Sequence, residues 1–243
     1  MPSSMYQTFR QALLLNNEGV EKLSEERDQE AIVLLTKSLT LVKQVLTAQD
    51  DDAMRVDHPS SQCAKKSDPI HQPCPFSLSS LSDLDCFVYS RPVLFSLEED
   101  TEQTVPERDT HIYSAVIIFN IALTYHRRGL SAQSAAPDVC LLKAEKMYDM
   151  VLSLLACDAF PFHHNCTSTI VKFAALNNLS QLKHFRGEYH ESVQGFQYLG
   201  SLLNSMVTSS ELTFGEGQEE QLVYQGMLLN AICIAPPDAA AAA

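Results

Sequence analysis

The stretch Leu176–Leu199 constrains the fold of this chain more than any other. Apolar residues recur at helical spacing on both sides of the short tripeptide Gly187-Glu188-Tyr189, which suits a tight turn. Two apolar-faced helices joined by a turn that contains glycine form a helical hairpin. We therefore expect a helical hairpin here.

Two copies of the spacing lie upstream, each with an asparagine two residues before a small residue. The pairs are Asn17 with Gly19, Asn120 with Ala122 and, in the opening stretch, Asn178 with Ser180. Asparagine is a mediocre helix former, because its side chain competes for backbone hydrogen bonds. Three asparagines at one position of three predicted helices therefore need an explanation.

This pattern resembles the tetratricopeptide repeat, a helical hairpin with fixed small, glycine and aromatic positions. The match is good in the second and third hairpins and weak in the first, where Glu26 stands at the turn glycine and Asp28 at the tyrosine. In the second hairpin an insertion from Leu130 to about Pro137 widens the turn, and proline suits the first turn of the next helix.

The resemblance implies an all-α fold of three antiparallel helical hairpins stacked as a right-handed array, closed by a C-terminal capping helix. The predicted parts are a first hairpin at 1–49, an insert at 50–109, a second hairpin at 110–157, a linker and third hairpin at 158–208, a capping helix at 209–235 and a disordered tail at 236–243.

The insert at 50–109 is rich in proline, serine and acidic residues, and we expect part of it to be disordered. One part of it, about 86–96, carries β-branched and aromatic residues, with Pro92 favouring an extended backbone. We expect this part to be ordered and packed on the outer face of the helices. The alternative is that Phe87–Phe95 fills the groove of the repeat array.

The resemblance also implies a concave groove lined by the first helix of each hairpin. There an asparagine can bind the backbone of an extended peptide, since its amide offers one donor and one acceptor. The structural alternative is that Asn17, Asn120 and Asn178 cap or bridge helices. The other residues expected to face a peptide are Phe119, Leu123, His126, Arg127, Asn177, Gln181 and His184.

Composition excludes some partners. Thirty acidic and 17 basic residues give a net charge of −13, which opposes binding to nucleic acid or to anionic membranes. The basic residues of a carboxylate clamp are absent, because Asn16, Val20, Ala174 and Asn178 stand at their positions. No uninterrupted apolar run reaches the ~18 residues that span a bilayer. Seven scattered cysteines, with no signal peptide, predict a reducing compartment, cytoplasmic with the nucleus not excluded.

Catalytic and metal sites have little support in the sequence. The set Cys63, His71, Cys74 and Cys86 and the cluster His163-His164-x-Cys166 hold zinc-type ligands at spacings that match no compact motif. No common nucleophile, phosphate-loop or dinucleotide motif occurs, so we predict no enzyme and no cofactor. The favoured function is a scaffold or adaptor that binds an extended segment of a protein partner. The alternatives are a structural subunit whose own insert fills the groove, and a metal or thiol enzyme.

Overall fold

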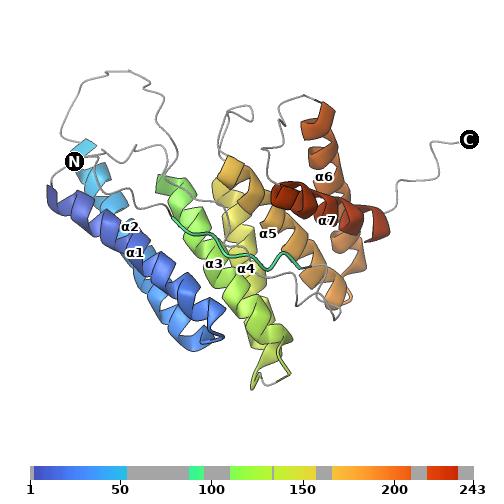
Figure 1. Cartoon of the computed structure of the whole chain (residues 1–243), viewed down its shortest axis with the longest axis horizontal. Coiled ribbons are helices and arrows are strands. Elements are labelled where there is room, and N and C mark those ends of the chain that lie inside the picture. Colours follow the sequence, from blue (N-terminus) through green and yellow to red (C-terminus); the bar gives the residue numbers. More distant parts are fainter. Residues whose placement is uncertain are drawn as a thin grey trace, which may run out of the picture. The chain divides into compact units, whose positions relative to one another are not determined.

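The computed structural model of the chain describes residues 3–53, 88–95, 110–132, 134–156, 166–208 and 218–234 (Figure 1). Its elements are, in chain order, α1 (Ser3–Ser24), α2 (Asp28–Ala53), α3 (Thr110–Leu130), α4 (Pro137–Ala156), α5 (Cys166–Phe185), α6 (Tyr189–Thr208) and α7 (Gln218–Ile234).

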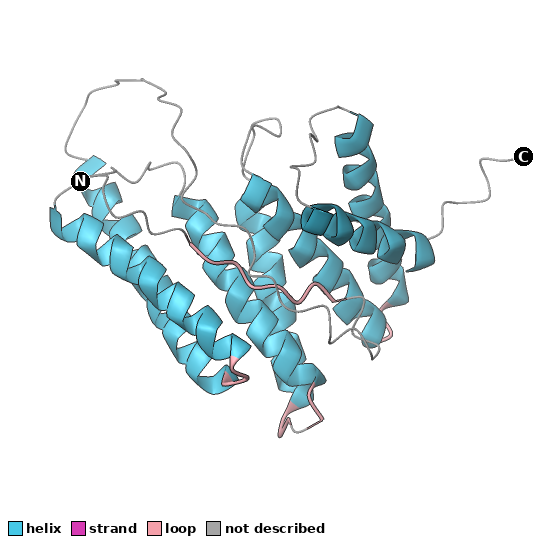
Figure 2. Ribbon diagram, viewed as in Figure 1, coloured by secondary structure: helices cyan, strands magenta, loops and turns pink. Residues whose placement is uncertain are grey.

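The prediction of an all-α protein is confirmed for these residues, whose regular structure is entirely helical (Figure 2). The start of α3 and the ends of α4 and α6 lie within two residues of the predicted boundaries at 110, 157 and 208, which is the usual scatter of such assignments. One helix differs: α2 continues to Ala53, beyond Asp50, where we expected the insert to begin. Helix α4 begins at Pro137, as the preference of proline for a first turn predicts.

The chain forms two compact units, each described by itself below. The first unit comprises residues 1–75 and 91–169, and the second comprises 76–90 and 170–243. Residues 88–95, called the insert segment from here on, therefore contribute residues 91–95 to the first unit and 88–90 to the second.

Helix α3 is the centre of the first unit. It packs against α2 on one side and α4 on the other, and α1 packs on α2. Most of its residues are buried, including the whole run from Ile112 to Thr124. A helix that is apolar around most of its circumference must be enclosed by neighbours. Phe119 and Tyr148 fill the space between α3 and α4, with ring centroids 6.0 Å apart.

The core of the second unit forms between α5, α6 and α7. Phe173 of α5 and Tyr224 of α7 have ring centroids 6.3 Å apart, in an edge-to-face arrangement. Phe196 and Leu199 of α6 are fully buried, so α6 presents its apolar face to this core.

The α1–α2 and α5–α6 connections share one backbone geometry. Glu26 and Gly187 both adopt a left-handed φ, of 61° and 79°. The amides of the following residues, Arg27 and Glu188, donate to the carbonyls of Lys22 and Lys183, both at 2.9 Å. This is the hydrogen bond that ends a helix in a Schellman turn. Both turns therefore have the same shape, although only one has glycine.

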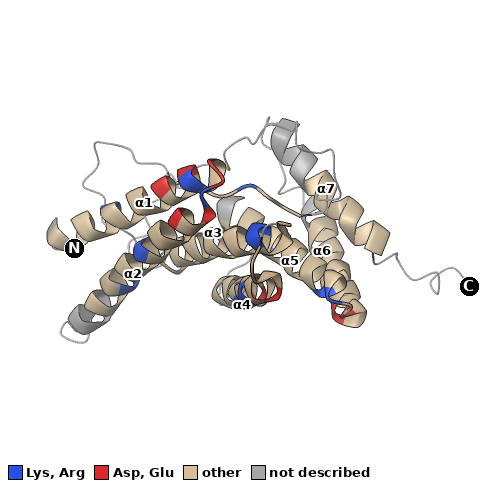
Figure 3. Cartoon of the chain, turned by 90° about the horizontal axis from the view of Figure 1, so that it is seen from below, with Lys and Arg blue, Asp and Glu red and all other residues tan. Residues whose placement is uncertain are grey.

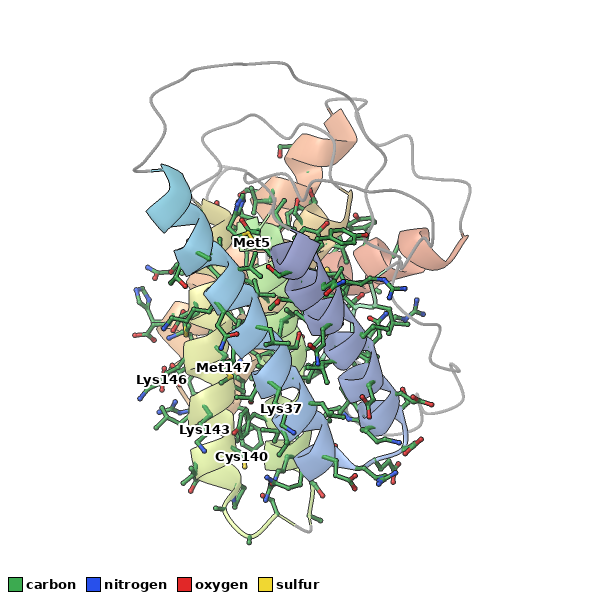
Figure 4. The ribbon with its side chains drawn as sticks, turned by 90° about the vertical axis from the view of Figure 1, so that its left-hand side faces the viewer. Met5, Lys37, Cys140, Lys143, Lys146 and Met147 are labelled. Carbon is green, nitrogen blue, oxygen red and sulfur yellow. The ribbon has the colours of Figure 1, made fainter. Side chains whose placement is uncertain are left out.

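The part Asp28–Ala48 of α2 is long and apolar enough to cross a membrane by length and composition alone, a test that the core helix of a soluble protein also passes. Lys37 and Lys43 interrupt this part, so it holds no uninterrupted apolar run of that length. The apolar face of α2 packs on α1 and α3, with Leu35 and Val42 fully buried. The exposed side carries Lys37, which Figure 4 shows on the face where Lys143 and Lys146 of α4 also lie.

Candidate functional site

In the first unit the backbone of the insert segment is bound by asparagine side chains of α1 and α3. Asn17 of α1 binds Phe95 through both of its amide atoms: Oδ1 accepts the Phe95 N–H at 2.8 Å, and Nδ2 donates to the Phe95 carbonyl at 2.8 Å. The amide donor and acceptor thus complement the two polar groups of one peptide residue.

Asn120 of α3 binds Val93 in the same way. Its Oδ1 accepts the Val93 N–H at 2.8 Å, and its Nδ2 donates to the Val93 carbonyl at 2.8 Å. Figure 1 shows this part of the segment crossing α3. In an extended chain the N–H and C=O of one residue point to the same edge, and those of the residue two positions on point there as well. Asn120 and Asn17 therefore bind Val93 and Phe95 along the same edge of the segment.

A third asparagine, Asn16, fixes the orientation of the other two amides. Its Oδ1 accepts from Asn120 Nδ2 at 2.9 Å, while its Nδ2 donates to the Val93 carbonyl at 3.1 Å and to Asn17 Oδ1 at 3.3 Å. Either amide would lose these bonds if it were flipped. The three side chains form one connected network, in which each hydrogen bond polarises its neighbours.

In the second unit Asn178 of α5 binds Tyr89 with the same pair of hydrogen bonds. Its Oδ1 accepts the Tyr89 N–H at 2.7 Å, and its Nδ2 donates to the Tyr89 carbonyl at 2.9 Å. Asn177 donates to Asn178 Oδ1 at 3.2 Å and accepts from Asn230 of α7 at 2.8 Å. A connected row of amides therefore runs from α7 to the insert segment.

The side chains of the insert segment are largely enclosed. Val93 is 0% exposed and Phe95 3%. The Phe95 ring lies 5.3 Å from the ring of Tyr113, which in turn contacts Phe9 edge to face at 4.9 Å. Arg91 is the charged residue of the segment. Figure 3 shows acidic and basic residues close together where α1 ends. The segment thus adds apolar core contacts to its backbone bonds.

Because they are buried, these amides need hydrogen-bond partners within the protein. Asn16, Asn120 and Asn178 are fully buried, and a buried amide without partners is destabilising by roughly 1–3 kcal/mol. In each unit the partner is the backbone of the insert segment. The chemistry open to these amides is hydrogen bonding, because an amide at neutral pH exchanges no proton and offers no nucleophile.

The expectation that the segment packs on the outer face is wrong. That expectation rested on the apolar composition of the segment, which does not show which helices it faces. In the first unit the bonds made by Asn17 and Asn120 place the segment on α1 and α3, and in the second unit those made by Asn178 place it on α5. Each of these is the first helix of a predicted hairpin, the side that the alternative assigned to the segment.

The other residues expected to face a peptide mostly contact the helical scaffold. Phe119, Leu123 and Asn177 are buried, Arg127 donates to the Leu23 carbonyl at 3.2 Å, and His184 lies against the ring of Tyr189. Gln181 is half-buried, and its Oε1 accepts no hydrogen bond from the described part of the chain.

His126 is enclosed rather than open to a ligand. Its Nδ1 lies 3.3 Å from the hydroxyl of Tyr148, and burial lowers its pKa to about 4. The uncharged imidazole therefore persists at neutral pH, because burial disfavours the charged form.

Asn16 and Asn230 were missed as site residues. A signal for Asn16 was present, since the doublets Asn16-Asn17 and Asn177-Asn178 each place a second amide beside the predicted one. Asn230 had no such signal, because its role depends on the packing of α7 in the second unit.

The candidate metal ligands at 63, 71, 74, 86, 163 and 164 lie outside the described residues, as does the side chain of Cys166. Within the ranges that are described, no group of three or more His, Cys, Asp or Glu side chains could hold a metal ion.

The chain was also compared with known proteins. No protein-family model, no curated protein and no solved structure matches it.

Proposed function

We propose that this chain is a non-enzymatic interaction module, similar to a tetratricopeptide-repeat domain, that binds an extended segment of a protein partner through asparagine side chains. The insert segment is its internal ligand, and a partner segment takes its place. The single observation that carries the proposal is the pair of hydrogen bonds from Asn120 to both backbone groups of Val93.

Three features support this proposal. The same bidentate contact is made by Asn17 and Asn178, which stand at the same position of the repeat pattern. The contact is made to the backbone rather than to side chains of the bound segment, so any extended segment with a free N–H can make it. The left-handed turns at Glu26 and Gly187 support equivalent first and third hairpins.

A second candidate function is favoured by the burial of Val93 and Phe95. In this alternative the insert segment is a permanent strut, and the chain is a structural subunit of an assembly. The two functions differ in one property, which is whether the segment leaves its site while the helices stay folded.

The test frees the site and supplies the segment as a separate peptide. Val93→Pro in the full chain removes the N–H that Asn120 accepts, so the internal segment docks more weakly and competes less with an added peptide. The probe is a fluorescent peptide of residues 86–97 with serine in place of Cys86. We expect it to bind this variant, and to bind the wild type at least about tenfold more weakly, because a tethered ligand acts at millimolar effective concentration.

The control adds Asn17→Ala and Asn120→Ala to the freed chain, which should abolish binding while circular dichroism shows the helices intact. If the Val93→Pro variant is folded and does not bind the peptide, the proposal is refuted and the structural-subunit function is favoured.

A further inference from the structure

The first unit contacts both the backbone and the side chains of the insert segment, and the two kinds of contact fall on the same residues of the segment. Val93 and Phe95 each have both backbone groups bound by an asparagine and a side chain that is almost fully enclosed. Leu94, between them, is only half-buried. The unit therefore distinguishes alternate residues of its ligand.

The position of Phe95 favours an aromatic side chain. Its ring meets Tyr113 of α3 at 5.3 Å in a tilted arrangement, and Phe9 of α1 closes the cluster against Tyr113. Aromatic rings gain from such contacts beyond the area they bury. An aliphatic or small residue at this position would leave part of the space between α1 and α3 unfilled.

The position of Val93 favours a small apolar residue with a free N–H. Its side chain has no exposed surface, so a larger one has no room to extend. Its N–H is donated to Asn120, which excludes proline. Proline is accepted one residue earlier, where Pro92 is buried and restricts the chain to a conformation compatible with docking.

The polarity of the bound chain is also defined within this unit. Val93 is held mainly from α3, and Phe95 from α1. A ligand therefore runs, from its N-terminus to its C-terminus, from α3 toward α1.

We infer that the first unit selects partner segments of the form small apolar–any residue–aromatic, preceded by a residue that can be proline, and that Val93-Leu94-Phe95 is the internal copy of this pattern. This inference rests on the proposed function, since it names the partner segment that replaces the insert segment.

The test varies the peptide and leaves the protein unchanged. The full chain carrying Val93→Pro is the host, and the parent peptide covers residues 86–97, with serine in place of Cys86. Alanine replaces Phe95 in one peptide and Leu94 in a matched control. A second pair carries an N-methyl group on the amide of Val93 or of Leu94.

Loss of the Phe95 ring should weaken binding at least about 30-fold, because a buried aromatic side chain supplies most of the apolar contact. Loss of the Leu94 side chain should change the dissociation constant by less than about threefold. N-methylation at Val93 should weaken binding at least about tenfold, and N-methylation at Leu94 much less, since only the former amide is donated to an asparagine.

Two failures are distinguishable. A parent peptide that does not bind the folded host refutes the proposed function, and the inference falls with it. A parent peptide that binds no better than the peptide lacking the Phe95 ring leaves the proposed function standing and overturns the inference. If Val93→Pro does not fold, Phe95→Ala in the full chain is the second host, and the wild type titrated to millimolar peptide is the third.

Discussion

Replacement of Asn120 by alanine separates binding of the insert segment from the stability of the helices. The change removes the acceptor of the Val93 N–H and the donor to Asn16 Oδ1, and both groups lie in buried surroundings. The Val93 carbonyl keeps its bond from Asn16 Nδ2. Two buried groups left without partners, at roughly 1–3 kcal/mol each, destabilise the docked state by about 2–6 kcal/mol.

The loss in the free energy of unfolding of the whole protein is limited, because it cannot exceed the free energy of docking if the segment is able to detach. Once docking is no longer favourable, the segment detaches, and both the Val93 N–H and the Asn16 Oδ1 are hydrated. Urea unfolding should then show a loss no larger than the free energy of docking. Amide exchange at Val93 and Phe95 should accelerate at least about 30-fold, which is the lower end of that range expressed as an equilibrium constant.

Thr124→Val is the matched control. Thr124 is also fully buried on α3, and its hydroxyl donates to the Asn120 carbonyl at 2.8 Å. That carbonyl already accepts a helical bond, so the substitution leaves no group without a partner and should leave exchange at Val93 unchanged. If Asn120→Ala lowers global stability and does not alter exchange at Val93 and Phe95, the asparagine is a core residue and the reasoning is refuted.

Three other outcomes are expected. Glu26→Gly should raise the free energy of unfolding, and Gly187→Ala should lower it, by about 1 kcal/mol each, because both positions have left-handed φ; chemical denaturation measures this. The free energy of unfolding should fall as the pH drops from 6.5 toward 4, by about 2 kcal/mol at pH 5. The reason is that the unfolded state takes up a proton that folded His126, with its pKa of about 4, does not. In His126→Gln this part of the pH dependence should be absent from denaturation curves. Gly195→Ala should destabilise the second unit by about 1–3 kcal/mol, since a Cβ there meets the Ser180 hydroxyl, and Ser180→Ala should relieve most of the loss in a double-mutant cycle.

Periodicity predicted helices such as α1 and α6 because their apolar residues recur on one face with the 3.6-residue period. The interval from Tyr113 to Phe119 illustrates the limit of this approach: it is buried almost all round, so no apolar stripe indicates which neighbours enclose it. The partners of α3 become clear only from the packing of α2 and α4 against it.

The asparagine series was visible in the sequence because one residue type recurred at one position. What those amides bind was not, since the bonds from Asn17 to Phe95 and from Asn178 to Tyr89 join residues far apart in the chain. His126 was misjudged for a related reason. Its spacing placed it near the asparagines, whereas its burial depends on Tyr148 of the next helix.

The central claim is that the insert segment is a ligand that can leave folded helices. Native-state hydrogen exchange at low denaturant tests it most directly, by following the amides of Val93 and Phe95 beside those in the middle of α3. The account predicts that the two segment amides exchange through an opening of lower free energy and smaller denaturant dependence than the α3 amides. If all of them instead exchange only through the same global unfolding, the segment is a permanent part of the core, and the claim is contradicted.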